Sequence, residues 1–218
     1  MKIIFMGTSS FALSILKRLI GKNYNIVAIY TQPPRPSGRG KKIKYGEVAS
    51  YVDKAGLPLF YPKNFLKAED VEQFYKFNAD LAVVVSYGLI LPKIILDGTL
   101  KGCFNIHASL LPRWRGAAPI QRALLSNDLE TGISIIKMEL GLDTGPIVAQ
   151  DVVKINSFDN SSSLHGKLSC LGGTLIINVL QNFEHCNFIP QSKIGISYAK
   201  KIHKNETKID WNNNAIDV

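Results

Sequence analysis

The hydrophobic and polar positions of this chain alternate between short apolar runs and amphipathic stretches. Apolar runs with the length and β-branched content of buried strands occupy residues 2–6, 25–30, 81–85 and 102–107. Residues 11–20 and 69–78 instead repeat apolar side chains at helical spacing. Strands that alternate with helices predict an α/β fold, Rossmann-like, with a mostly parallel twisted sheet flanked by helices on both faces.

The second half of the chain continues with a pair of strands and a long helix. Apolar runs at residues 131–138 and 147–155 bracket a glycine-rich connection and predict a two-stranded unit. A helix then begins at Asp159 or Asn160, either of which can cap it. Its helical period is carried by Leu164, Leu168, Leu171 and Leu175. From about residue 187 the periodic signal fades.

Residues 31–44 are expected to form a long loop. Regular structure is excluded there by prolines and glycines, namely Pro33, Pro34, Pro36, Gly38 and Gly40. The same segment is strongly basic, with no acidic residue among Arg35, Arg39, Lys41, Lys42 and Lys44. A loop of this length inside a compact domain is usually functional or disordered, and its charge suits the phosphates of a nucleic acid.

Composition and charge narrow the class of protein. The 218 residues are 46% hydrophobic and 20% charged, which is ordinary for a globular protein with one core and a small appendage. Lys and Arg outnumber Asp and Glu by 26 to 17, so the net charge of +9 favours an acidic partner such as nucleic acid. No apolar run approaches the roughly 18–20 residues of a membrane span, and no membrane association is expected.

Cysteine and glycine spacings argue against several cofactors. Cys103, Cys170 and Cys186 are far apart and lack C-x-x-C spacing, which disfavours both a disulfide framework and a zinc site. A reducing, cytoplasmic setting without a metal is therefore expected. The turn after residues 2–6 contains a single glycine, Gly7, so the fingerprint of a dinucleotide site is absent and no NAD is expected.

Candidate chemistry gathers at the end of the run 102–107. Asn105 and His107 are two residues apart, so on a strand their side chains share one face. An amide can stabilise an oxyanion without titrating, and an imidazole can donate to that oxyanion or relay a proton. A carboxylate at Asp143, if folding brings it close, would fix the tautomer of the imidazole. Together these groups could support acyl transfer to an amine without a protein nucleophile.

Each of these residues also has a purely structural interpretation. An Asn-x-His pair on a strand is more often part of a core or a surface than of an active site, and Asp143 in a glycine-flanked loop can simply form a turn. Ser109 lacks the G-x-S-x-G elbow of a hydrolase nucleophile, so hydrolysis is disfavoured. Residue spacing alone leaves the choice between these interpretations open.

Three segments together resemble the methionyl-tRNA formyltransferases. These segments read TQPPRPSGRGKK, FNIHASLLPRWRGAAPIQRAL and TGISIIKMELGLDTGPI, and the resemblance extends from KIIFMGT to the region around IDW. The Asn-x-His, SLLP and Asp elements are shared by the wider superfamily of folate-dependent formyltransferases. PRWRGAAPIQ and the basic loop are the parts that point to charged initiator tRNA.

The resemblance implies transfer of a formyl group from 10-formyltetrahydrofolate to the α-amino group of initiator methionyl-tRNA, by a protein expected to be a monomer. It gives Asn105, His107 and Asp143 the catalytic positions. It gives a folate-binding role to Ser109, Leu110, Leu111 and Pro112, and the lining of a pterin pocket to Tyr87, Gly88, Leu89, Ile90, Leu91 and Pro92. It assigns contact with tRNA to Arg35, Arg39, Lys41 and Lys42.

The resemblance also predicts how the chain is divided. Residues 1–187 correspond to the formyltransferase catalytic domain, and residues 188–218 to an extension that leads toward a C-terminal β-barrel domain, which is missing here. Weaker tRNA binding is expected without that domain. Two alternatives stay open: an N-formyltransferase acting on a sugar nucleotide or another amine, which needs no basic loop, and a non-catalytic remnant that binds folate or RNA.

Overall fold

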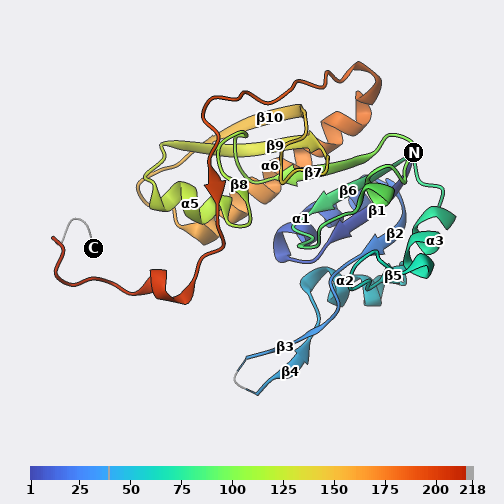
Figure 1. Cartoon of the computed structure of the whole chain (residues 1–218), viewed down its shortest axis with the longest axis horizontal. Helices are drawn as coiled ribbons and strands as arrows, with labels where there is room; N and C mark the ends of the chain where they lie inside the picture. Colours follow the sequence, from blue (N-terminus) through green and yellow to red (C-terminus); the bar gives the residue numbers. More distant parts are fainter. Residues whose placement is uncertain (39, 215–218) are drawn as a thin grey trace.

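A seven-stranded sheet runs through the computed structural model, which describes residues 1–38 and 40–214 (Figure 1). Its strands are β1 (Lys2–Gly7), β2 (Asn25–Tyr30), β5 (Leu59–Phe60), β6 (Leu81–Val85), β7 (Cys103–His107), β9 (Glu130–Lys137) and β10 (Ile147–Lys154). The order across the sheet is β10-β9-β7-β6-β1-β2-β5. The strands from β7 to β5 are parallel, whereas β9 and β10 are antiparallel to their neighbours. The predicted mostly parallel α/β fold is therefore confirmed.

Helices cover both faces of this sheet. They are α1 (Ser10–Gly21), α2 (Glu47–Ala55), α3 (Ala68–Lys76), α4 (Lys93–Leu96), α5 (Pro119–Leu125) and α6 (Ser161–Gln181), with short 3-10 helices η1 (Phe183–His185) and η2 (Lys204–Thr207). Ile3 and Phe5 of β1 pack with α1, α2, α5 and α6, whereas Ile4 and Met6 pack on the opposite face with α3 and α4. Because helices cover both faces of the sheet, the sequences of the fully buried strands are continuous apolar runs.

Helix starts follow the capping residues that the sequence offers. Asn160, and not Asp159, caps α6: its side chain accepts from the backbone N–H groups of Ser162 and Ser163. Ser9 caps α1 in the same way through Ala12. Within the part of the chain that the structure describes, no helix combines the length and the apolar character needed to span a bilayer.

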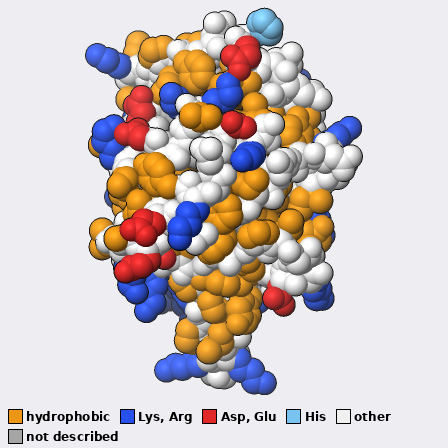
Figure 2. All heavy atoms as spheres, turned by 90° about the vertical axis from the view of Figure 1, so that its right-hand side faces the viewer, with side chains coloured by type: hydrophobic (Ala, Val, Ile, Leu, Met, Phe, Trp, Pro, Cys, Tyr) orange, Lys and Arg blue, Asp and Glu red, His pale blue; other side chains and the backbone are white. Residues whose placement is uncertain are grey.

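The prediction that residues 31–44 lack regular structure is wrong. Strands β3 (Arg35–Ser37) and β4 (Lys42–Lys44) form an antiparallel hairpin in which Pro36 lies opposite Ile43. A two-stranded ribbon consists only of edge strands, where a proline can be accommodated. The hairpin projects from the body (Figure 1). Figure 2 shows Lys and Arg side chains on both sides of its end, at the bottom of the view, below a column of hydrophobic side chains.

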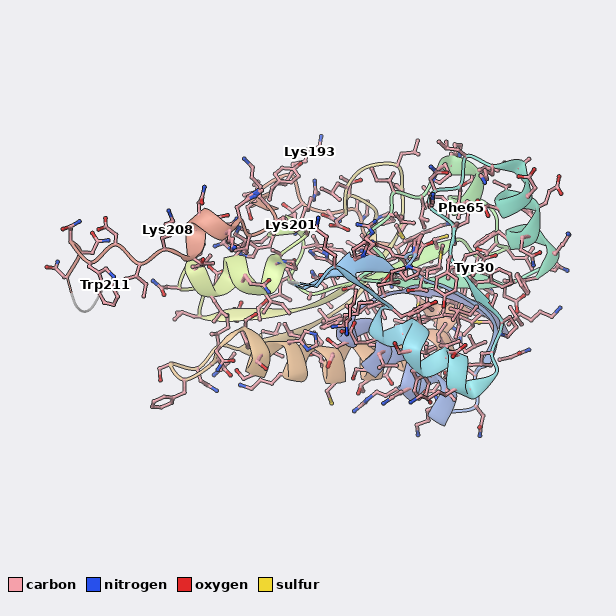
Figure 3. The ribbon with its side chains drawn as sticks, turned by 90° about the horizontal axis from the view of Figure 1, so that it is seen from below. Tyr30, Phe65, Lys193, Lys201, Lys208 and Trp211 are labelled. Atoms are coloured by element: carbon pink, nitrogen blue, oxygen red, sulfur yellow. The ribbon has the colours of Figure 1, made fainter. Side chains whose placement is uncertain are left out.

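The chain after η1 returns across the sheet before it leaves the body. We call residues 188–200 the return segment. Its Ile189 forms a bridge with Ile147, and its strand β11 (Tyr198–Ala199) pairs in parallel with β8 (Arg115–Gly116). Beyond it Glu206 still pairs with Arg122 of α5, and the chain then extends away from the body through Lys208 and Trp211 (Figure 3). The first part of the predicted extension 188–218 is therefore packed against the sheet.

Gly7 is required by the close approach of β1 and α1. A Cβ atom at this position would lie 2.7 Å from Ala12 Cβ and 2.9 Å from the carbonyl oxygen of Val85. We expect Gly7→Ala to lower the free energy of unfolding by about 1–3 kcal/mol, because the backbone of the core must shift. Urea denaturation measures this change. Gly21→Ala, at the open end of α1, is the matched control and should be neutral or stabilising; equal midpoints for the two variants would contradict the packing argument.

Candidate active site

The carboxyl end of β7 brings together the three residues that the sequence analysis grouped. His107 is buried, with 5% of its surface exposed, and Asn105 is half-buried on the same face of the strand. Asp143 reaches them from the connection between β9 and β10. Asn105 Nδ2 donates to Asp143 Oδ1 at 3.0 Å, and His107 Nδ1 lies 3.6 Å from Asp143 Oδ2. An amide, an imidazole and a carboxylate therefore form one cluster.

The tautomer of His107 follows from its second contact. His107 Nε2 lies 2.8 Å from the backbone carbonyl oxygen of Trp114. A carbonyl oxygen can only accept, so Nε2 carries the hydrogen and the neutral ring has its lone pair at Nδ1. That lone pair faces the carboxylate of Asp143. The two ring nitrogens therefore have different partners, a backbone carbonyl at Nε2 and a carboxylate at Nδ1.

Asp143 is held by donors on both carboxylate oxygens. While Oδ1 accepts from Asn105, Oδ2 accepts from the backbone N–H of Gly116 at 2.8 Å. The backbone of Asp143 has φ of 51°, in the left-handed region that non-glycine residues rarely adopt. Gly116 itself has φ of 115°, and a Cβ there would lie 3.0 Å from the carbonyl oxygen of Ala199. The carboxylate is thus fixed by a strained loop and a glycine.

Trp114 is anchored on both its side chain and its backbone. Its Nε1 donates to Asp128 at 2.7 Å, and the guanidinium of Arg113 lies 4.4 Å from its ring centroid. Arg113 also makes a bidentate pair with Asp128 at 2.6 and 2.9 Å. Partial burial favours the neutral acid, but hydrogen bonds from Arg113 and Trp114 outweigh it and lower the pKa of Asp128. The carbonyl group that orients His107 is therefore part of a rigid turn.

The predicted folate segment that begins at Ser109 is largely internal. Ser109 is fully buried; its hydroxyl donates to the carbonyl of Arg113 at 2.6 Å, and its own carbonyl accepts from Ser134 Oγ at 2.6 Å. The only proton of this hydroxyl is thus committed to the turn, in agreement with the argument against a hydrolase nucleophile. Leu111 is also buried, whereas Leu110 and Pro112 are half-buried. Those two side chains are the apolar part of the segment that remains partly exposed.

The predicted pterin-pocket segment follows β6 and comprises Tyr87, Gly88, Leu89, Ile90, Leu91 and Pro92. It leaves the sheet next to the cluster, because Val84 of β6 pairs with Asn105 of β7. Tyr87 and Leu91 belong to the core, and burial raises the pKa of Tyr87. Ile90 is 91% exposed. Within this segment Ile90 therefore presents its side chain to solvent, unlike Tyr87 and Leu91.

The predicted tRNA residues lie on a different element from the cluster. Arg35, Lys41 and Lys42 are exposed on the β3–β4 hairpin, and Arg39 lies outside the described residues. In the described parts of the chain, residues 1–38 and 40–214, no group of three or more His, Cys, Asp or Glu residues is arranged to hold a metal ion.

A cleft of about 460 Å³ lies beside the loop that carries Asp143. It is lined by Arg115 of β8 and by residues of the 139–146 loop and of the return segment, among them Thr144, Pro146, Gln191 and Lys193. Sequence reasoning missed the structural parts of this site. The segment PRWRGAAPIQ contains Trp114 and Gly116 but gives neither residue a role in the cluster, and Gln191 lies where the periodic signal fades. No side-chain pattern indicates a contact made by a backbone carbonyl or N–H.

Comparisons with known proteins agree on one family. The family model described as "Formyl transferase" matches residues 1–180. The methionyl-tRNA formyltransferase of Roseobacter denitrificans is 45% identical over 218 residues, which are 100% of this chain and 72% of that protein. The methionyl-tRNA formyltransferase of Brucella ovis is 48% identical over 221 residues, with the same coverage.

Solved structures match the fold at lower identity. Phosphoribosylglycinamide formyltransferase from Bacillus halodurans superposes with a TM-score of 0.70 and 24% identity, over 84% of this chain and 95% of that one. The N-formyltransferase from Helicobacter canadensis, in complex with folinic acid and dTDP-3-aminofucose, gives a TM-score of 0.74 and 19% identity, over 100% and 77% of the two chains.

Proposed function

The chain belongs to the formyl transferase family and, within it, to the methionyl-tRNA formyltransferases, and from this premise we propose that it transfers a formyl group from 10-formyltetrahydrofolate to the α-amino group of initiator methionyl-tRNA. The observation that carries the proposal is the Asn105–His107–Asp143 cluster at the end of a parallel strand. The amine attacks the formyl carbon, the bond from that carbon to N10 breaks, N10 gains a proton and the amine loses one. No protein nucleophile is needed.

Asn105 is proposed to stabilise the tetrahedral oxyanion. One of its two amide N–H groups donates to Asp143, and this bond orients the side chain. The other N–H is left for the oxyanion. A pre-oriented donor of this kind is worth about 10²–10³ in rate in comparable sites, because it needs no reorganisation as charge develops.

His107 and Asp143 are proposed to handle the proton of the amine. Because Nε2–H donates a hydrogen bond to the backbone carbonyl of Trp114, the basic atom of the ring is Nδ1. Asp143 cannot readily turn away to act alone, since both its oxygens accept from fixed donors. We therefore assign proton uptake to His107 Nδ1 and stabilisation of the resulting imidazolium to Asp143.

The folate co-substrate is proposed to bind where residues 87–92 and 109–112 adjoin the cluster. The exposed side chain of Ile90 and the half-buried side chains of Leu89, Leu110 and Pro112 offer apolar cover for a pterin ring. Apolar walls with a few convergent polar groups are typical of small-molecule sites.

The basic hairpin is proposed to contact the phosphates of the tRNA. Lys41 and Lys42 are exposed near its end. Replacing both by alanine should weaken tRNA binding and reduce the slope of log K against log salt by about 2, because each phosphate contact releases a counterion. Filter binding at several salt concentrations measures the slope. Lys54→Ala with Lys76→Ala, on exposed helix surfaces, is the control; a slope shared with this control would show that the hairpin lies away from the RNA.

Incubation with a formyl-labelled donor tests the proposed function. The label should enter acid-precipitable methionyl-tRNA and not an amino-sugar nucleotide supplied in parallel. Labelling of the sugar nucleotide alone would favour the alternative acceptor, and folate binding without labelling of either would favour a non-catalytic protein.

A further inference from the structure

Gln191 of the return segment links the loop of Asp143 to a buried arginine. Its Nε2 donates to the carbonyl oxygens of Asp143 and Gly145, both at 2.8 Å. Its Oε1 accepts from Arg115 Nε at 3.1 Å and from Arg115 Nη2 at 2.6 Å. Two donors and two acceptor sites are all that a carboxamide has, so every one of them is used.

The loop needs such an anchor. Asp143 has φ of 51°, a left-handed backbone that is unfavourable at a non-glycine residue and persists only where its surroundings hold it. The chain is also tight at Gly145, where a Cβ would overlap the carbonyl oxygen of Lys137. The two hydrogen bonds from Gln191 end on Asp143 itself and on Gly145. They therefore act on the backbone that aims the carboxylate at Asn105 and Gly116.

Arg115 shows why an amide, and not a carboxylate, occupies position 191. Only 7% of its surface is exposed, and a glutamate would satisfy its guanidinium at least as well as glutamine does. A glutamate has no N–H groups, however, and would turn a negative oxygen toward the two loop carbonyls. The arginine tolerates either residue, whereas the loop of Asp143 requires the amide.

We propose that Gln191 is a positioning residue for formyl transfer, which acts by holding the loop of Asp143 so that its carboxylate meets His107. This inference rests on the proposed function. It places part of the catalytic arrangement in the return segment, outside the range 1–187 that the sequence resemblance assigns to the catalytic domain.

The variant Gln191→Glu separates this role from folding. Its pair with Arg115 should keep the return segment docked, while turnover falls by about 100-fold, the usual result when a catalytic group is misplaced by about 1 Å. KM for both substrates should stay within about threefold of the native value, because binding surfaces are unchanged. Gln181→Glu, the same substitution at an exposed position of α6, is the control. Native turnover in Gln191→Glu would overturn the proposal.

A double variant shows whether Gln191 acts through Asp143. If it does, adding Gln191→Glu to Asp143→Asn should lower turnover by no more than about threefold beyond Asp143→Asn alone, because the group being positioned is already lost. A further loss of about 100-fold would mean that Gln191 acts on another part of the site, and would overturn the proposal.

Amide hydrogen exchange gives a readout that does not need activity. The N–H of Gly116 is protected by Asp143 Oδ2, and the N–H of Ala117 by the carbonyl of Ala199 in the return segment. In Gln191→Glu the Gly116 amide should exchange at least about tenfold faster while Ala117 is unchanged. Unchanged exchange at Gly116, or faster exchange at both amides, would overturn the proposal. A native protein that transfers no formyl group would refute the proposed function, but the exchange result would still decide the role of Gln191.

Discussion

Replacing His107 by alanine should lower turnover by about 10²–10⁴-fold, the range expected for a positioned acid or base. The variant removes the Nδ1 atom that faces Asp143. It also removes the Nε2–H group that donates to the backbone carbonyl of Trp114. Single-turnover rates at saturating folate and tRNA measure the loss. The Trp114 carbonyl loses its partner, which costs about 1–3 kcal/mol of stability, so the thermal midpoint should be measured on the same sample.

The exposed His185 offers a matched control for this experiment. His185→Ala, in η1, should keep native turnover and a native thermal midpoint. Near-native turnover in a folded His107→Ala protein would remove the imidazole from the mechanism and leave Asp143 as the base.

Asp143→Asn should also lower turnover by about 10²–10⁴-fold, with little change in size or packing. The amide removes the negative charge that we propose stabilises an imidazolium at His107. In the native protein Asn105 Nδ2 and the Gly116 N–H donate to opposite oxygens of Asp143, and asparagine replaces one of these oxygens by an NH₂ group that cannot accept. One of the two donors loses its bond in the native geometry, so the loss combines a missing charge with a disturbed geometry. Turnover against pH, compared with the native protein, is the measurement.

Asp53→Asn, on the exposed surface of α2, is the matched control and should behave as the native protein. If Asp143→Asn keeps more than about a tenth of native turnover, neither the charge nor the geometry of this carboxylate matters to the reaction, and the assignment of the cluster fails.

The parts of the fold predicted well are those in which burial alone decides structure. Strands β2 and β6 occupy the predicted residues, because both faces of the sheet are covered and, apart from the exposed Asn25 that begins β2, both strands are apolar. The hairpin at residues 31–44 was missed because prolines that would break a central strand are accommodated in an isolated ribbon. Hydrophobic patterns report burial, and the hairpin is exposed.

The candidate site also contains residues that the sequence can predict and residues that it cannot. Asn105, His107 and Asp143 could be grouped because side chains of these types at strand and loop positions carry a chemical signature. The carbonyl of Trp114 and the N–H of Gly116 could not be found, since they depend on backbone angles of 64° and 115°. Gln191 lies in a segment held by hydrogen bonds to other parts of the chain, which leave no period in the sequence.

The most direct test of the account is single-turnover formyl transfer from 10-formyltetrahydrofolate to methionyl-tRNA, with methionine amide as a parallel acceptor. We expect this chain to form formyl-methionyl-tRNA, and to do so faster than it formylates the small amine, because the proposed contacts between the RNA and the basic hairpin would add binding energy. Folded protein that binds the folate and transfers its formyl group to neither acceptor would contradict the central claim that the Asn105–His107–Asp143 cluster is a working formyltransferase site.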